Sequence, residues 1–113
     1  MSQKEEKIAL YIANAAELGL GLSDDLISKV ITGLGPSIYN ADSETVACTQ
    51  SSELDTIKNN FLVKKLGIGA SDEVMNAAIK SACEKMGTSN RNKYRALVYA
   101  LLVKEFNKEY VYD

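Results

Sequence analysis

The sequence contains no histidine among its 113 residues. Histidine is the usual general base near neutral pH, the partner of Ser and Cys nucleophiles, and the commonest transition-metal ligand. The two cysteines, Cys48 and Cys83, are too few to form a structural zinc site. We therefore expect no catalytic residues, no bound metal and no cofactor, and we predict that the protein is not an enzyme.

Long apolar segments are also absent. The N-terminal residues MSQKEEK contain no basic region followed by an apolar run, so they do not resemble a signal peptide. No stretch reaches the roughly 18 apolar residues of a transmembrane helix. The sequence thus predicts a cytoplasmic protein that does not enter a membrane. In such a protein we expect Cys48 and Cys83 to be reduced and buried rather than paired.

Charge is nearly balanced over the whole chain but not along it. The net charge is −2, yet residues 1–56 carry 3 basic and 9 acidic side chains, whereas residues 57–113 carry 10 basic and 6 acidic ones. Two interpretations are open: the two halves face each other or a second copy, or the basic half meets an anion. A sequence pI of about 5.2 argues against nucleic acid as a partner.

Helical periodicity and capping residues predict an all-α protein. Gly and Ser fall where helices should end and begin, and no sustained alternation of apolar and polar residues indicates a strand. The length suits one domain with one core over residues 1–113. The predicted helices cover residues 3–18, 24–32, 52–66, 72–86 and 89–106.

Two connections between these helices have nearly the same sequence. Residues 18–27 are LGLGLSDDLI, and residues 66–75 are LGIGASDEVM. Each supplies a Gly that ends one helix. Each then supplies a Ser, followed by two acidic residues, that begins the next helix. They indicate αα-hairpins over residues 1–34 and 52–87, which arose either by duplication or by convergence on one good connection.

The last predicted helix, from Ser89 to Phe106, is the expected centre of the fold. Every residue from Ala96 to Val103 is apolar, and a helix that is apolar on all sides is a buried one. We therefore predict a compact five-helix single domain, built from the two αα-hairpins and a central buried C-terminal helix.

The start of this helix is polar and basic, and it is the candidate site for an anion. Free backbone N–H groups and the helix dipole favour negative charge at such a position. Arg91 and Arg95 repel each other unless an acid lies between them. That acid is either a ligand such as phosphate or a carboxylate from the acidic half, for which Asp42 and Glu44 are candidates. The candidate residues are Ser89, Asn90, Arg91, Asn92, Lys93 and Arg95.

Three segments together resemble a family of small bacterial proteins known only as a domain of unknown function. They are GPSIYNAD (35–42), ELDTIKNNFLVKKLG (53–67) and SNRNKYRALVYALL (89–102). The resemblance implies a small cytoplasmic helical protein and brings no activity, cofactor or site. We predict a non-catalytic protein-interaction or self-associating domain; the alternative is a binder of a small anion or phosphorylated ligand at the start of the last helix.

Overall fold

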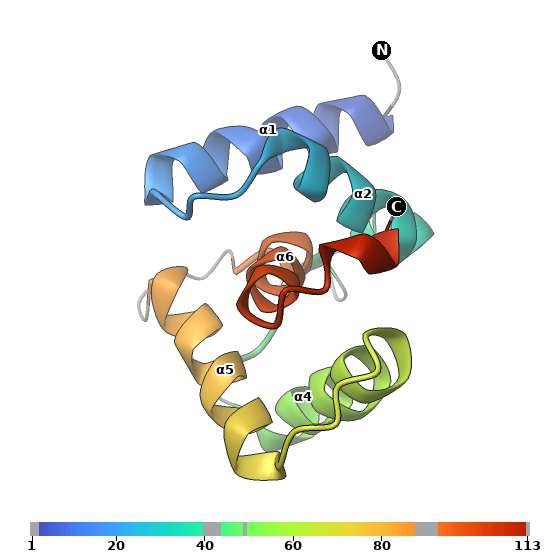
Figure 1. Cartoon of the computed structure of the whole chain (residues 1–113). Coiled ribbons are helices and arrows are strands. Elements are labelled where there is room, and N and C mark those ends of the chain that lie inside the picture. Colours follow the sequence, from blue (N-terminus) through green and yellow to red (C-terminus); the bar gives the residue numbers. More distant parts are fainter. Residues whose placement is uncertain (1–2, 40–43, 49, 88–92, 113) are drawn as a thin grey trace.

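The computed structural model of the chain describes residues 3–39, 44–48, 50–87 and 93–112 (Figure 1). Within these ranges the chain forms five main helices and no strand, which confirms the all-α prediction. The elements are α1 (Gln3–Leu18), α2 (Asp24–Leu34), the 3₁₀-helix η1 (Gly35–Tyr39), α4 (Ser51–Thr56), the π-helix η2 (Ile57–Lys65), α5 (Asp72–Lys85), α6 (Arg95–Glu105) and the 3₁₀-helix η3 (Glu109–Tyr112).

The two similar connections fold in the same way. Gly19 and Gly67 both have φ of +66°, a left-handed conformation that glycine adopts without a Cβ clash. The hydroxyl of Ser23 accepts a hydrogen bond from the backbone N–H three residues later at 3.1 Å, and the hydroxyl of Ser71 does the same at 3.3 Å. Each predicted αα-hairpin is thus joined by a glycine stop followed by a serine cap.

Helix α6 lies between the two hairpins. Figure 1 shows it almost end-on, with α1 and α2 on one side and α4 and α5 on the other. It contacts α1, α2 and α5, and η3 returns to pack against α2. The central position predicted for the last helix is therefore confirmed.

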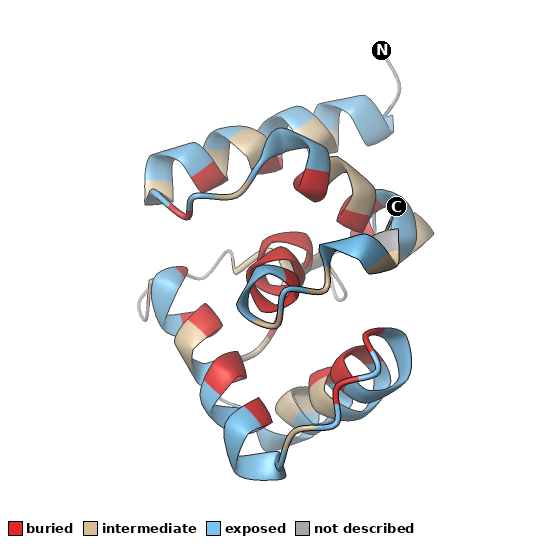
Figure 2. Cartoon of the chain, viewed as in Figure 1, coloured by how far each residue is buried: buried red, intermediate tan, exposed pale blue. Residues whose placement is uncertain are grey.

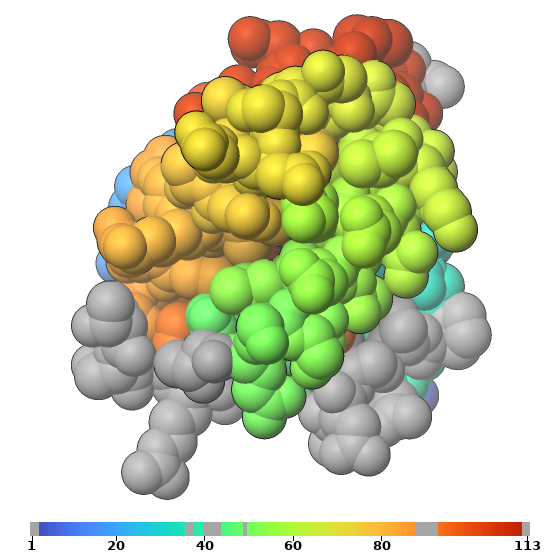
Figure 3. All heavy atoms as spheres, turned by 90° about the horizontal axis from the view of Figure 1, so that it is seen from below, coloured from blue at the N-terminus to red at the C-terminus, as the bar shows by residue number. Residues whose placement is uncertain are grey.

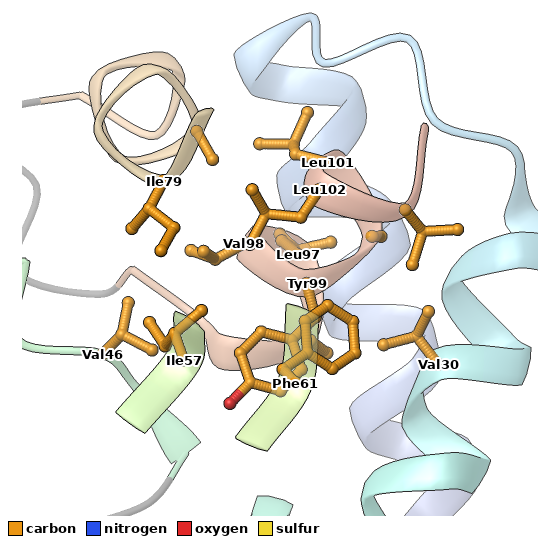
Figure 4. Packing of buried hydrophobic residues seen from close by; sticks show 14 of the residues in the cluster. Val30, Val46, Ile57, Phe61, Ile79, Leu97, Val98, Tyr99, Leu101 and Leu102 are labelled. Carbon is orange, nitrogen blue, oxygen red and sulfur yellow. The ribbon is translucent and has the colours of Figure 1, made fainter. Parts of the chain in front are cut away.

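Burial on all sides of α6 follows from this position. All eight residues from Ala96 to Val103 are buried, and Figure 2 shows the buried colour on the central turns of the helix. Figure 4 shows the surrounding side chains, which come from both hairpins. Val30 of α2, Ile57 and Phe61 of η2, and Ile79 of α5 belong to the same buried cluster. A single core therefore unites the two hairpins.

The third predicted helix is in the expected place but is wound differently. After α4 the chain continues as the π-helix η2, in which the N–H of each residue donates to the carbonyl five residues earlier. The winding agrees with the apolar spacing, since Leu66, the residue after η2, lies nine positions after Ile57. Nine residues make about two and a half turns of an α-helix, which would put the two side chains on opposite faces. They make about two turns of the wider π-helix, and both side chains are buried.

The last helix begins later than predicted. Tyr94 has an extended conformation, with φ −60° and ψ 129°, and α6 starts at the next residue, Arg95. The cause is pairing with the segment 44–48, since the N–H of Val46 donates to the carbonyl oxygen of Lys93 at 2.9 Å. Thr45 and Tyr94 form an isolated antiparallel bridge beside this bond. Lys93 therefore precedes the helix instead of lying in its first turn.

The prediction of two reduced cysteines is wrong. Cys48 and Cys83 form a disulfide, with their Cα atoms 6.2 Å apart, a separation that a disulfide readily spans. Spacing in the sequence could not show this, because the pairing depends on how the segment 44–48 packs against α5. Among the described helices, none has the length and hydropathy needed to cross a bilayer.

Candidate functional site

The segment 44–48 is bonded to α1 through its first residue, Glu44. The carboxylate of Glu44 accepts hydrogen bonds from Lys7 Nζ at 2.5 Å and from the Tyr11 hydroxyl at 2.6 Å. Burial alone would raise the pKa of Glu44, but these two hydrogen bonds outweigh burial and lower it. Burial and the neighbouring carboxylate raise the pKa of Tyr11. Glu44 is therefore ionised and Tyr11 neutral near pH 7, which keeps the hydrogen bonds intact.

Arg95, the first residue of α6, binds inside the protein. Its guanidinium donates hydrogen bonds to Glu53 of α4 at 2.5 Å and to the Tyr99 hydroxyl at 2.9 Å, with a longer one to the Thr45 carbonyl at 3.5 Å. Burial alone would lower the pKa of Arg95, but Tyr99 and Glu53 together raise it. The Tyr99 ring in turn stacks on Phe61, with centroids 3.9 Å apart. The guanidinium therefore links α4 to α6 next to the core.

The contacts of Arg95 bear on the predicted anion site, for which the partner of the arginines was either an external anion or an internal carboxylate. The structure describes two of its six residues, Lys93 and Arg95, whereas Ser89, Asn90, Arg91 and Asn92 lie outside the described residues. A carboxylate from the acidic half meets Arg95, as one of the two alternatives predicts. That carboxylate belongs to Glu53; Glu44 bonds to α1 instead, and Asp42 is not among the described residues.

Lys93 has a different environment, because it lines a pocket. The pocket has a volume of about 530 Å³, within the range of roughly 300 to 1,000 Å³ that is common for small-molecule sites. In Figure 3 the start of α4 (green) lies beside α5 (orange) on this face of the molecule. The lining residues come from the segment 44–48, from α4, from α5 and from the segment before α6: Cys48, Ser51, Leu54, Asp55, Asn76, Lys80, Cys83, Glu84 and Lys93.

The pocket combines an apolar wall with charged groups. Leu54 and the disulfide supply apolar surface, and Lys80 and Lys93 supply two positive charges. Two carboxylates, those of Asp55 and Glu84, also line the pocket. The carboxylate of Asp55 lies 3.8 Å from Lys58, which partly offsets its charge.

The residues that α5 contributes to the pocket were missed by the sequence interpretation. Asn76, Lys80, Cys83 and Glu84 follow the spacing i, i+4, i+7 and i+8, which places them on one face of a helix. This face adjoins the buried face of α5. A cysteine among polar residues on such a face is a signal in the sequence, but it shows a pocket only after the segment 44–48 is in place.

Other functional sites find little support. Within the described ranges, no three His, Cys, Asp or Glu side chains are grouped as metal ligands. A second, smaller pocket of about 280 Å³ lies between α5 and the end of α6, where Val74 and Phe106 contribute apolar surface and Glu105 the only full charge. The larger pocket is therefore the candidate site.

Comparison with known proteins identifies a family of unknown function. Residues 10–110 match the family described as "Protein of unknown function (DUF2853)". A search of curated proteins finds no significant match. The function must therefore be argued from the geometry of the pocket.

Proposed function

The chain belongs to the DUF2853 family of proteins of unknown function. We propose that it is a non-catalytic binding domain for a small organic anion. The observation that carries the proposal is the pocket of about 530 Å³ lined by Lys80 and Lys93 beside an apolar wall. This pocket shares one residue, Lys93, with the predicted anion site. The proposed ligand binds in the pocket and not at the N-terminus of the last helix.

The geometry supports an amphipathic ligand rather than a free inorganic ion. Leu54 and the disulfide provide a surface against which an apolar group loses contact with water. Ser51 and Asn76 provide side-chain hydrogen-bond donors and acceptors at the same pocket. A ligand that uses both kinds of surface binds more tightly than one that uses the charges alone, because exposed charge pairs contribute little by themselves.

We expect an anion rather than a cation, although two lysines and two carboxylates line the pocket. Lys80 and Lys93 come from different parts of the chain. The carboxylate of Asp55 is 65% exposed and lies 3.8 Å from Lys58, and Glu84 is also exposed, so we expect both to contribute less to the field in the pocket than the half-buried Lys93. We therefore expect binding to weaken as the salt concentration rises.

Self-association, the other function that the sequence predicts, stays a prediction. The largest exposed apolar side chains come from five different elements, and isolated apolar residues of this kind are normal on protein surfaces. They are Leu10, Tyr39, Val63, Val74 and Tyr110. Cytoplasmic localisation also stays a prediction, and the disulfide weakens it because disulfides persist mainly in oxidising compartments.

The experiment is a fluorescence titration with 1-anilinonaphthalene-8-sulfonate, which has an aromatic body and one sulfonate. We expect saturable binding to the folded protein, with amide NMR shifts for residues around Leu54, Asn76 and Lys80. The double substitution Lys80→Gln and Lys93→Gln should weaken binding about five- to tenfold, since each lysine supplies an attraction that solvent partly screens.

The matched control is Lys85→Gln, which removes a lysine from the same helix, α5, at an exposed position outside the pocket. This variant should bind the probe as the original protein does. NMR shifts that map to the smaller pocket around Val74 and Phe106, or equal affinities for all variants, would refute the proposal.

A further inference from the structure

The disulfide itself is part of the pocket wall. Both Cys48 and Cys83 line the pocket, although Cys83 is only 7% exposed, whereas Cys48 is half-buried. A molecule in the pocket therefore has access to a reactive bond as well as to an apolar surface. Cys48 is the more exposed residue of the two, so we take its sulfur as the point of attack.

We infer that the pocket is a site of thiol–disulfide exchange with a small thiol that carries a carboxylate. This inference rests on the proposed function, and it assigns the chemical class of the ligand. The carboxylate would bind near Lys80 and Lys93, and the thiol group would face the disulfide between Cys48 and Cys83.

The reaction is a balanced exchange that needs no further oxidant or reductant. The thiolate of the small molecule attacks the sulfur of Cys48, and a new sulfur–sulfur bond forms as the bond to Cys83 breaks. Cys83 leaves as a thiolate and then takes up a proton from solvent. The product is a mixed disulfide at Cys48, which Cys83 reverses by attacking the same sulfur and expelling the small thiolate.

The two lysines favour this exchange in two ways. They attract the anionic thiol to the pocket, which raises its local concentration. They also stabilise the thiolate that leaves, since Lys80 precedes Cys83 by three positions and shares its face of α5. The C-terminal end of a helix and the adjacent carboxylate of Glu84 both disfavour a thiolate, so the stabilisation of Cys83 depends on these lysines.

Exchange would also release a structural tether. Cys48 lies at the end of the segment 44–48, whose other end is bonded to α1 through Glu44. Formation of the mixed disulfide removes the covalent link between this segment and α5, while the contacts with α1 and α6 remain. The modification would therefore change one wall of the pocket and leave the core intact.

The experiment compares three thiols of similar size on the oxidised full-length protein: 3-mercaptopropionate, 2-mercaptoethanol and cysteamine. Samples are quenched with an alkylating reagent, and loss of the disulfide is followed by intact-mass spectrometry. After correction for the thiolate fraction of each reagent, we expect the anionic thiol to react about five- to tenfold faster than the neutral one and the cationic thiol to react slowest.

The lysine variants show whether the pocket causes this order. In the double variant Lys80→Gln and Lys93→Gln, the anionic thiol should react at about the same corrected rate as the neutral one. In Lys85→Gln the anionic thiol should keep its faster rate. High salt should also reduce the advantage of the anionic thiol. Equal corrected rates for the three thiols, or a disulfide that reacts only after the protein is unfolded in urea, would overturn the inference.

The two proposals fail in different ways. The sulfonate probe contains no thiol, so its binding to the pocket tests the proposed function alone. Binding of the probe without any preference among thiols rejects the exchange and keeps the binding function. A preference for the anionic thiol that the lysine substitutions do not change rejects the pocket as its cause, and thereby rejects the inference.

Discussion

The guanidinium of Arg95 donates a hydrogen bond to the carboxylate of Glu53 over a distance of 2.5 Å, although the two residues are 42 positions apart in the chain. Only 12% of the Arg95 side chain and 22% of the Glu53 side chain are exposed. The pair joins α4 to the first residue of α6, so it connects one hairpin to the central helix.

Loss of the Glu53 charge should destabilise the protein. Glu53→Gln leaves the half-buried Arg95 without its anionic partner, and we expect a loss of about 1.5 to 3 kcal/mol in the free energy of unfolding. Urea denaturation measures it. The control is Asp25→Asn, which removes a 78% exposed partner of Lys29 and should cost about 0.5 kcal/mol or less. Equal small losses for both variants would show that the Arg95 pair adds no stability.

Acid should weaken the protein through Glu44. The folded-state pKa of Glu44 lies below its ordinary value of 4.5, because the hydrogen bonds from Lys7 and Tyr11 outweigh burial. Its contribution is therefore complete above pH 4.5 and is lost as the pH falls from there through the folded-state pKa. Melting temperatures measured from pH 3 to pH 7, at intervals of about 1 pH unit, should show this decline.

The variant Glu44→Gln identifies the source of the decline. It should be less stable than the original protein at pH 7 and should lose less stability on acidification, since the titrating group is gone. An unchanged pH profile would mean that other carboxylates cause the acid sensitivity.

Removal of the disulfide should lower stability without abolishing the fold. The bond between Cys48 and Cys83 closes a loop over a sequence separation of 35 residues, for which loop-closure entropy predicts a contribution of about 3 to 4 kcal/mol. The double variant Cys48→Ser and Cys83→Ser measures it by urea denaturation. Addition of reductant should destabilise the original protein but leave the double variant unchanged, and a reductant effect on both would contradict this assignment.

The centre of α6 should be the most sensitive part of the core. Leu101 is 5% exposed, so Leu101→Ala should cost about 2 to 5 kcal/mol. Val63 of η2 is 43% exposed, and Val63→Ala should cost about 0.5 kcal/mol or less. Similar losses at the two positions would mean that the packing around α6 differs from the one described.

Helix positions and the central place of α6 could be predicted from the sequence because their causes are local. Glycine stops, serine caps and the apolar run from Ala96 to Val103 lie next to the structure that they determine. The π-helical winding of η2 was not predicted, since residues 52–66 were expected to form one ordinary helix. The late start of α6 had no local signal, because it depends on pairing between Val46 and Lys93.

The candidate site could be predicted only in part, because it depends on contacts between distant segments. Lys93 was recognised as basic, but its pocket is completed by α4 and α5. A carboxylate of the acidic half was one of the two partners predicted for Arg95, and the choice of Glu53 over Glu44 depends on which helix each carboxylate faces. The disulfide depends on the same packing. It contradicts the expectation of two reduced cysteines, which was based on the absence of a recognisable signal peptide in the sequence.

The covalent bond between Cys48 and Cys83 also determines what happens when the chain is cut. The connection from η2 to α5, which contains the exposed Gly69, lies inside the closed loop. A protease that cleaves there produces two fragments that remain one molecule, because the disulfide still joins them. The nicked protein would migrate as a single band on a non-reducing gel and would separate into two bands only after reduction.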